Sequence, residues 1–501
     1  MIAFETLHAA PPALTAHAPL LMVVAPLIAA CAAALAPSAR TSWMISVTGS
    51  VFATWMALAV AGEVARRGVV DYVIGGFAPP LGIALHIDGL GVMVALLVSS
   101  AGVMASLYSG HSLTTEVGAE KHTLVQSGFL LCQTGLLGLV ATGDAFNAFV
   151  FLEVSSIGTY ALVAIGEKRD RRALPAAFNY LIMGTIGATF YVIGIGFLYA
   201  ATGTLNMADM AARLATLDDS SVVQAGFAFV VVGLGIKAAM FPLHGWLPGA
   251  YSYAPSLITI VLAATATKTS IYLMARFVFD VFPYDAPFGQ AFVTWVLAPL
   301  AATGAIVCSM QAVFEKEIRR ILAFSSVAQV GFILLGLSLA TVGGASAGLF
   351  YLGAHALIKM TLFMALGGVA LSLGARRLGE FAGVAREAPW SATAFAIGAA
   401  SLAGVPLTLG FLAKWRLIEA ALQAGAIWVV VVLAIASLLP AAFGLGPVYV
   451  IGALTGSVYF IHRAVQLVRR PERAQAMRSF FASIVQLSLL LIAACLDRAI
   501  A

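Results

Sequence analysis

Lysine is rare in this chain and is concentrated in its most apolar stretches. Seven of the 501 residues are lysines, and four of these lie in or beside stretches long enough to cross a membrane: Lys237, Lys268, Lys359 and Lys414. A charge inside a bilayer costs at least about 2.5 kcal/mol, so it is rarely accidental. A lysine in a low-dielectric site can release its proton, whereas an arginine keeps its proton at any working pH. The lysines therefore indicate proton handling rather than anchoring.

Glu153 is the carboxylate best suited to work with these lysines. It lies near the middle of the stretch GDAFNAFVFLEVSSIGTYALV. A carboxylate buried there takes up a proton or finds a cation. If Glu153 pairs with Lys237, each side chain holds the other charged, and separating them makes Lys237 give up a proton. The alternative is a structural ion pair that only ties two helices together.

Two of the lysines lie beside prolines that should interrupt a helix. Lys237 comes shortly before Pro242, and Lys414 follows Pro406. A break frees backbone carbonyls that water can satisfy, so a lysine beside it can exchange protons with a water wire. His244, in FPLHGWLP, can load or unload protons at the first break, or it can be a plain loop residue.

Each of the remaining candidate residues has a possible role in proton transfer and a simpler structural explanation. Lys268 lies in the run TATKTS, whose threonine hydroxyls can form a hydrogen-bonded relay. His355 and Lys359 are spaced i, i+4, so they share one helix face and can pass a proton along. Lys268 and Lys414 can instead extend toward a membrane interface, and His355 can simply be hydrogen-bonded.

These residues must be positioned by membrane-spanning helices. The chain is 61% hydrophobic and 10% charged, against about 25% charged residues in soluble domains. Apolar runs of about 20 residues recur along the chain, which predicts an all-α polytopic membrane protein with about 14 or 15 transmembrane helices. The net charge of +5 follows from basic cytoplasmic loops and needs no nucleic-acid partner. The predicted spans are 18–37, 42–62, 87–109, 123–143, 145–166, 176–201, 222–241, 255–278, 289–312, 321–341, 346–374, 392–423, 426–443, 448–468 and 478–496.

Two spans should be broken helices, because 222–241 runs into Pro242 and 392–423 contains Pro406. Interrupted helices in corresponding positions of two halves indicate an ion or substrate site. Basic loops are expected on the cytoplasmic side, which places the N-terminus outside, although the loop 469–478 falls on the opposite side. The three loops that agree are 167–172, 315–320 and 375–386.

Several long motifs give the chain a resemblance to a known family. The motifs occur in the family's order over about residues 85–438. Through them the chain resembles the proton-translocating membrane subunits shared by respiratory complex I (N-, M- and L-like) and Mrp-type cation/proton antiporters. The resemblance is strongest to the Mrp D subunit. The resemblance implies two inverted five-helix repeats with a broken helix in each. It places N-terminal helices at 1–110, a first half-channel at 111–280 and a second at 281–440. The motifs are GDAFNAFVFLEV, ATGTLNMADM, GIKAAMFPLHGWLPGAYSYAPS, RRILAFSSVAQVGFILLGL and HALIKMTLFMALG.

The resemblance also implies roles for the charged residues. It assigns a charged pair to the first half-channel, then a bridging lysine, a connection to the second half and a terminal lysine: Glu153 with Lys237, Lys268, His355 with Lys359, and Lys414. It implies action within a multi-subunit complex in a bacterial inner membrane, with other membrane subunits as partners and with protons and Na⁺ as transported ions. Neither the residues nor the resemblance indicates a catalytic set, a cofactor or a metal site.

The end of the chain departs from this resemblance. From about Pro440, it looks more like the last two helices of haem O synthase-type prenyltransferases, although the Asp-rich prenyl-diphosphate motifs of that family are absent. We therefore expect an atypical transmembrane tail over 441–501, with altered contacts to a neighbouring subunit.

Three functions remain open at this point. The first is a proton-conducting subunit of an Mrp-type Na⁺/H⁺ antiporter. The alternative is the proton-pumping membrane subunit of an NADH:quinone oxidoreductase or a membrane hydrogenase, which would make the chain part of an enzyme. The third is a membrane scaffold whose buried charges only pair with one another.

Overall fold

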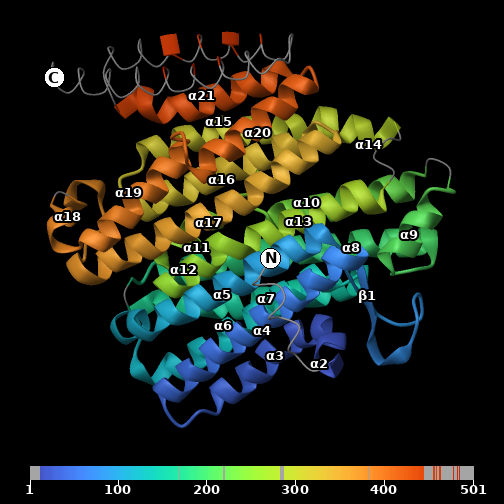
Figure 1. The fold of residues 1–501 in the computed structure, drawn as a ribbon, viewed down its shortest axis with the longest axis horizontal. Helices are drawn as coiled ribbons and strands as arrows, with labels where there is room; N and C mark the ends of the chain where they lie inside the picture. The colour runs from blue at the N-terminus through green and yellow to red at the C-terminus, as the bar shows by residue number, and fades with distance from the viewer. Residues whose placement is uncertain are drawn as a thin grey trace. The chain divides into compact units, whose positions relative to one another are not determined.

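The computed structural model describes residues 12–444, apart from 169, 218–219, 283–286 and 382, together with isolated positions beyond 444. These residues form a largely helical protein (Figure 1). The chain divides into two compact units, each described here by itself. The first unit comprises Met1–Ala239 and Leu243–Gly289, and the second comprises Met240–Pro242 and Gln290–Ala501.

The first unit is a bundle of long helices. Neighbouring helices in the chain pack on one another, as α3 on α4, α6 on α7, and α8 on α10. A π-helical segment, Leu262–Ala266, joins α12 to α13, and a second one, Phe277–Val281, follows α13. The helices are α2 (Pro12–Ala16), α3 (Ala18–Ala34), α4 (Ala39–Arg67), α5 (Gly89–Glu116), α6 (His122–Ala141), α7 (Ala145–Ala164), α8 (Ala173–Thr202), α9 (Met207–Leu214), α10 (Ser221–Lys237), α11 (Leu247–Tyr253), α12 (Ser256–Val261) and α13 (Thr267–Arg276).

A short β-hairpin links α4 to α5. Strands β1 (Val70–Val73) and β2 (Ala84–Ile87) pair antiparallel, with Val70 opposite Ile87 and Val73 opposite Ala84. This hairpin was not predicted from the sequence. At the end of the hairpin, the side chain of Asp88 accepts from the amide of Gly91 at 2.8 Å and so caps the start of α5.

The second unit is also helical. Helix α16 packs on α15 and α17, and α17 packs in turn on α19 and α20. A π-helical segment, Val293–Leu297, leads into α15. The helices from Pro287 onward are α14 (Pro287–Phe292), α15 (Ala298–Phe314), α16 (Ile318–Ser338), α17 (Val342–Leu373), α18 (Val384–Glu387), α19 (Pro389–Ala403), α20 (Leu409–Gln423) and α21 (Ile427–Gly444).

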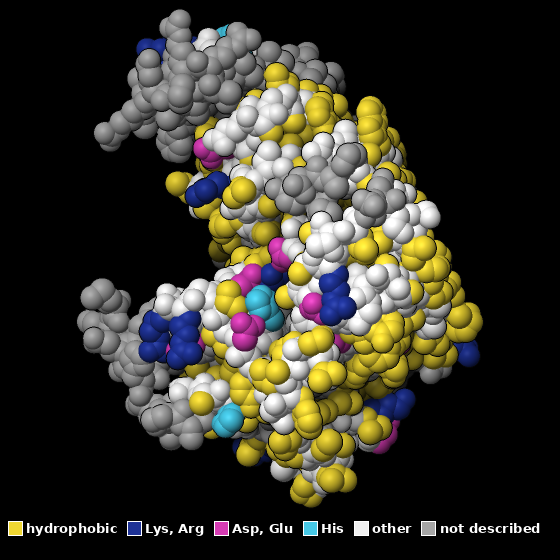
Figure 2. All heavy atoms as spheres, turned by 90° about the vertical axis from the view of Figure 1, so that its right-hand side faces the viewer, with side chains coloured by type: hydrophobic (Ala, Val, Ile, Leu, Met, Phe, Trp, Pro, Cys, Tyr) yellow, Lys and Arg dark blue, Asp and Glu magenta, His cyan; other side chains and the backbone are white. Residues whose placement is uncertain are grey.

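The prediction of an all-α polytopic membrane protein is confirmed. In the described part of the chain, nine helical stretches are long and apolar enough to cross a membrane, and three shorter apolar helices accompany them. Hydrophobic side chains spread over much of the face in Figure 2, whereas charged side chains gather in a few groups. The predicted spans 448–468 and 478–496 lie almost entirely outside the described residues. The inverted repeats stay a prediction.

Both predicted helix breaks are present. Helix α10 ends at Lys237, and no regular helix resumes until α11 begins at Leu247. The predicted span 392–423 is divided into α19 and α20, with Thr408 capping the start of α20. In each case a proline lies within the interruption, as expected from its missing N–H group.

Glycines let α8 and α10 approach at backbone contact. A Cβ atom added at Gly194 would lie 2.7 Å from the carbonyl oxygen of Gly226, and one added at Gly233 would lie 2.6 Å from that of Gly187. Such distances are below van der Waals contact, so only glycine fits at these positions. Small residues of this kind are the usual means of close helix packing in membranes.

Two of the predicted basic loops of the second unit lie together. The amide of Ile318 donates to the carbonyl of Arg376 at 3.1 Å, and Glu317 forms an isolated antiparallel bridge with Arg377. The exposed Glu380 accepts from the backbone amides of Arg376 and Arg377 at 2.7 and 3.0 Å. These hydrogen bonds hold the pKa of the Glu380 carboxyl below its usual value.

Candidate proton-transfer site

The position of Glu153 is set by how α7 begins and how closely it packs on α6. Asp144 caps α7, since its side chain accepts from the amide of Asn147 at 2.7 Å. A Cβ atom added at Gly135 of α6 would lie 2.5 Å from the amide nitrogen of Ser155. The cap fixes where the helix starts, and the close contact fixes its distance from α6. Glu153 therefore has a defined place on α7.

Lys237 is the last residue of α10. The carbonyls of the last helical turn lose their usual i+4 partners. The carbonyl of Ile236 accepts instead from the amide of Ala239 at 3.1 Å and from the ring nitrogen of Trp246 at 2.8 Å. This contact folds the irregular segment back against the helix end. Lys237 is thus held at a helix terminus, where backbone groups and water can exchange hydrogen bonds.

Glu153 and Lys237 form an ion pair. The Lys237 ammonium lies 3.3 Å from Oε1 of Glu153, and it also donates to Ser156 at 2.7 Å and Tyr160 at 3.2 Å. The side chain of Lys237 is 7% exposed and that of Glu153 is 25% exposed. The ammonium therefore has one charged and two neutral partners, all on α7.

Ser156 and Tyr160 were not predicted from the sequence. Their signal is their spacing: together with Glu153 they lie at i, i+3 and i+7 along α7, which places all three on one helix face. A search of the face that carries Glu153 would have found both residues.

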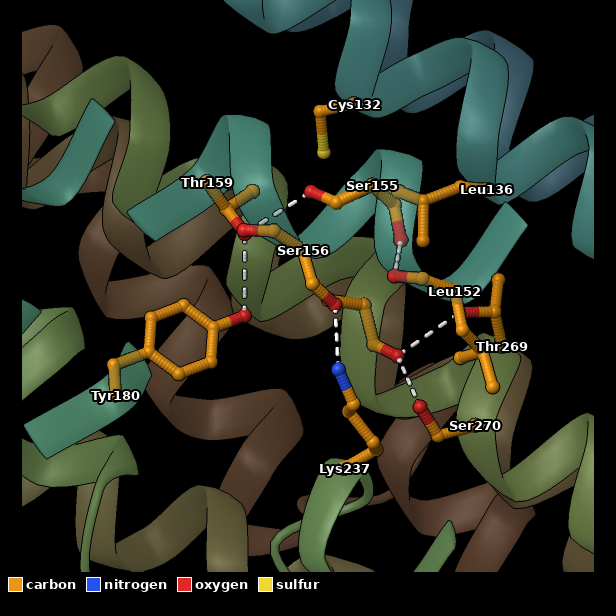
Figure 3. Close-up of a pocket in the computed structure, with 11 residues that line it drawn as sticks. Cys132, Leu136, Leu152, Ser155, Ser156, Thr159, Tyr180, Lys237, Thr269 and Ser270 are labelled. Atoms are coloured by element: carbon orange, nitrogen blue, oxygen red, sulfur yellow. Dashed lines mark hydrogen bonds between the residues drawn. The ribbon is translucent and has the colours of Figure 1, made fainter. Parts of the chain in front are cut away.

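A small pocket lies beside the pair (Figure 3). Figure 3 shows the Ser156 hydroxyl at the Lys237 ammonium, with Thr269 and Ser270 of α13 on another side of the pocket. Most of its polar lining consists of hydroxyl groups, which can both donate and accept hydrogen bonds. A proton leaving Lys237 thus has neutral relay groups next to it. The lining residues are Cys132, Leu136, Leu152, Ser155, Ser156, Thr159, Tyr180, Lys237, Ala266, Thr269 and Ser270.

Lys268 is fully buried in the first unit and is held by neutral oxygens. Its ammonium donates to the carbonyl of Ala263, within the π-helical segment, and to the hydroxyl of Thr267 at 3.2 Å. Of the threonines expected to form a relay, only Thr267 contacts it. Thr265 and Thr269 donate to carbonyls of their own helix, at 2.6 and 2.9 Å.

His244 lies in the turn between α10 and α11. The residue is 9% exposed, and its backbone carbonyl accepts from the amide of Leu247 at 3.0 Å. It is therefore a buried member of the turn and not an exposed loop residue. Its part in proton transfer stays a prediction.

In the second unit, His355 and Lys359 lie one turn apart on α17, and both are almost fully buried. The Lys359 ammonium donates to the carbonyl of Leu322 at 2.8 Å and to the hydroxyl of Ser325 at 2.5 Å. Both acceptors belong to α16. The buried lysine thus joins two packed helices through neutral oxygens.

Lys414 reaches back across the second helix break. Its ammonium donates to the carbonyl of Ala403, the last residue of α19, at 2.8 Å and to the hydroxyl of Ser437 on α21 at 3.3 Å. The break exposes that carbonyl because the helix does not continue to satisfy it. The side chain is therefore held at the interruption.

The structure thus brings Glu153 and Lys237 together and places Lys268 in the same unit. His355, Lys359 and Lys414 belong to the other unit, so a continuous polar axis through all six residues stays a prediction. Each unit contains a broken helix with a lysine beside the interruption.

Comparison with known proteins identifies the family. A family model described as "NADH:quinone oxidoreductase/Mrp antiporter, TM" matches residues 142–440, which is more than half of the chain. The chain belongs to this family. The match covers the Glu153–Lys237 pair and the other predicted site residues.

Members with different names are similar over most of the chain. The N subunit of the NADH-quinone oxidoreductase of Desulforudis audaxviator is 42% identical over 436 residues, covering 86% of this chain and 85% of that protein. The D subunit of the Na⁺/H⁺ antiporter of Alkalihalophilus pseudofirmus is 30% identical over 362 residues, covering 72% of each. These relatives are subunits of multi-subunit membrane complexes, and the resemblance to both groups is confirmed.

A solved structure extends the similarity. A chain of the membrane-bound sulfane sulfur reductase, an archaeal respiratory membrane complex, superposes with a TM-score of 0.79 at 30% identity, covering 95% of this chain and 99% of that chain. The predicted prenyltransferase-like tail over 441–501 lies largely outside the described residues and beyond the family match, which ends at 440. That part of the sequence analysis stays a prediction.

Proposed function

We propose that this chain is a proton-translocating integral membrane subunit of a multi-subunit complex. The observation that carries the proposal is the ion pair between Glu153 and Lys237, at the end of a broken helix and beside a pocket lined by hydroxyl groups. Membership of the family supports it.

The pair can work as a switch. While the carboxylate lies beside the ammonium, each charge compensates the other in a low-dielectric site. When Glu153 moves away or takes up a proton, Lys237 loses the one charged partner that it has among the described residues and keeps two hydroxyl partners, Ser156 and Tyr160. Its proton can then pass to water in the pocket. Re-forming the pair resets the element.

The remaining charged residues extend the path in this proposal. Lys268 continues it in the first unit, His244 exchanges protons at the helix break, and the second unit contributes three groups: His355, Lys359 and Lys414. The division into half-channels at 111–280 and 281–440 is part of the same proposal.

Two kinds of complex are compatible with this mechanism. In an antiporter, the complex would exchange protons for Na⁺ across a bacterial inner membrane. The 30% identity to the D subunit of an antiporter supports this function. In a respiratory complex, redox chemistry in other subunits would drive proton movement through this chain. The 42% identity to the N subunit of an oxidoreductase supports that function. Purification from native membranes with identification of the associated subunits separates the two.

The mechanism is tested by Lys237→Ala and Glu153→Gln in the intact complex. Proton movement into membrane vesicles, followed with a pH-sensitive dye, should fall by at least about tenfold, because proton transfer by a positioned group contributes about 10²–10⁴-fold. Glu63→Gln is the matched control, since Glu63 forms exposed ion pairs with Arg66 and Arg67 at the end of α4. Near-normal transport by both variants would favour the scaffold reading instead.

A further inference from the structure

A second polar region lies between α4, α5 and α6 of the first unit, and it shares no residue with the Lys237 pocket. Helix α4 contributes buried serines at i, i+4 and i+8, which share one helix face, and α6 contributes glutamines at i and i+7. Helix α5 packs on both and contributes further buried serines. The Ser42 hydroxyl, at one end of the α4 face, donates to the carbonyl of Ala33 on α3 at 2.9 Å. The members are Ser42, Ser46 and Ser50 of α4, Ser106, Ser109 and Ser112 of α5, and Gln126 and Gln133 of α6.

Hydrogen bonds tie the three helices together along this polar seam. The Ser50 hydroxyl donates to Oε1 of Gln133 at 2.8 Å, which joins α4 to α6. The Gln126 amide donates to the Ser109 hydroxyl at 2.8 Å, which joins α6 to α5. Trp43 of α4 donates to the carbonyl of Ser106 at 2.8 Å, which joins α4 to α5.

The same seam contains buried polar atoms that have no hydrogen-bond partner among the residues that the structure describes. They are Nε2 of Gln133, Oε1 of Gln126 and the hydroxyls of Ser46 and Ser112. The two glutamines are 2% exposed and the two serines are 0% exposed. Exchanging the amide oxygen and nitrogen of either glutamine would not satisfy both atoms. Each amide has one hydrogen-bond partner, so its other atom would still be unpaired.

Water is the ligand that fits these atoms. Buried polar groups in proteins are almost always bonded, and those that lack a protein partner are usually bonded to internal water. Such water needs several polar partners, and the seam supplies them: the Ser50 hydroxyl contacts the amide of Gln133, and the Ser109 hydroxyl contacts that of Gln126. The hydroxyls of the seam can both donate and accept, as a hydrogen-bonded chain of water requires.

The seam runs toward a carboxylate at the end of α5. The side chain of Glu116, the last residue of α5, is 6% exposed and accepts from the amide and the hydroxyl of Ser256 at 2.6 Å each. Ser112 lies one turn before it on the same helix, i and i+4, and so faces the same side. A proton acceptor thus stands at one end of the seam and Gln133, near the middle of α6, at the other.

We propose that α4, α5 and α6 enclose a file of bound water molecules that extends from Glu116 to Gln133 and exchanges protons with the Glu116 carboxyl group. The binding of water follows from the unpaired atoms alone, whereas the proton exchange rests on the proposed function. The charged pair Glu153–Lys237 is not needed for the water to bind, so the two proposals can fail separately.

The first test is a map of the intact complex by electron cryo-microscopy at a resolution that shows ordered water. Density within hydrogen-bonding distance of Nε2 of Gln133 and Oε1 of Gln126 is the expected result. A map in which these amides turn to bond protein groups, with no water density between the three helices, would overturn the proposal.

The second test is proton transport by Gln133→Leu and by Ser46→Ala in the same complex. Each change removes an unpaired atom of the seam, and transport should fall by about threefold or more, since such polar networks act together. Ser46→Ala adds no bulk, so it serves if Gln133→Leu does not assemble. Thr134→Val is the control, because the Thr134 hydroxyl is satisfied by the carbonyl of Leu130 at 2.9 Å.

The outcomes separate this inference from the proposed function. If both seam variants assemble and transport like the control while Lys237→Ala is inactive, the proton exchange is overturned and the proposed function stands. If Lys237→Ala transports normally, the proposed function fails, and the water density alone decides whether the file exists.

Discussion

Lys237 and Lys268 are buried lysines of the same unit, but their ammonium groups have different partners. Lys237 lies 3.3 Å from a carboxylate and donates to two hydroxyls. Lys268 donates to a backbone carbonyl and one hydroxyl, both neutral. The first lysine is attached to a neighbouring helix through an opposite charge, whereas the second is attached to its own helix.

In the proposed mechanism, this difference gives the two lysines different tasks. A carboxylate compensates a buried charge more strongly than neutral oxygens do, and it can be moved or protonated. In that proposal, Glu153 is the element that switches Lys237. The carbonyl that holds Lys268 belongs to a π-helical segment, where the usual helical bonding is shifted by one residue. Lys268 is thus bound by a fixed feature of the backbone and suits a passive relay.

The largest effect is expected for Lys237→Arg. Arginine keeps a positive charge beside Glu153 but cannot release its proton, so an ion pair that is only structural would survive the change. Proton transport should fall by about 10²-fold or more. The readout is dye-detected proton uptake by vesicles, and Lys121→Arg, at an exposed lysine, is the control. Normal transport by Lys237→Arg would mean that charge alone is required.

Thr267→Val should have the next largest effect, because it removes the hydroxyl that accepts a hydrogen bond from the Lys268 ammonium at 3.2 Å. A hydrogen bond to a charged group contributes about 1.5–3 kcal/mol, and about 1.4 kcal/mol corresponds to a factor of ten. We expect transport to fall by roughly tenfold. Thr265→Val is the matched control, since the Thr265 hydroxyl donates to the carbonyl of Val261 and not to Lys268. An equal loss of transport in both variants would mean that the substitutions disturb the helix itself.

Ser156→Ala should have a smaller effect than Thr267→Val. It removes the 2.7 Å hydrogen bond to Lys237 but leaves Glu153 and Tyr160 in place. Transport should fall by about threefold, less than a full charged hydrogen bond would cost. If this variant loses more transport than Thr267→Val, measured in the same vesicles, the carboxylate is not the dominant partner of Lys237.

The smallest effect on proton transport is expected for the exposed carboxylate Glu380, which serves as a reference for the buried lysines Lys237 and Lys268. The pKa of Glu380 is held below its ordinary value of 4.5 by the amides of Arg376 and Arg377. A carboxyl whose pKa is lowered on folding stabilises the loop above its unfolded pKa, and that contribution is lost as pH falls through the folded pKa. Protection of the 376–381 amides against hydrogen exchange, taken relative to the intrinsic exchange rate at each pH, should therefore fall below about pH 4.5.

Glu380→Gln tests that reference. The variant should remove most of this pH dependence and leave proton transport near pH 7 unchanged. A clear loss of transport at neutral pH would show that the loop does more than hold itself in place.

Sequence patterns predicted the helices well, because both their apolar length and their ends leave signals. The stretch 145–166 was predicted as a span and α7 runs from Ala145 to Ala164, where Asp144 supplies a typical N-cap. The prolines marked both broken helices. Glu153 and Lys237 could be singled out because a charge is conspicuous in an apolar run.

Other features left a weaker signal or none. Ser156 and Tyr160 share a helix face with Glu153, but their contact with Lys237 depends on where α10 packs. The π-helical segment Leu262–Ala266 differs from an α-helix only in its hydrogen bonding, which composition does not reveal. The orphaned amides of Gln126 and Gln133 become apparent only when the surrounding helices are in place.

The glycine contact between α8 and α10 limits how the switch can move. With backbones touching at Gly194 and Gly226, and again at Gly187 and Gly233, α10 can neither slide along α8 nor turn about its own axis without collision. These backbone contacts hold the middle of α10 against α8. In the proposed mechanism, the motion that parts Lys237 from Glu153 is therefore left to their side chains. The proposed switch can therefore operate without a movement of the helix bundle.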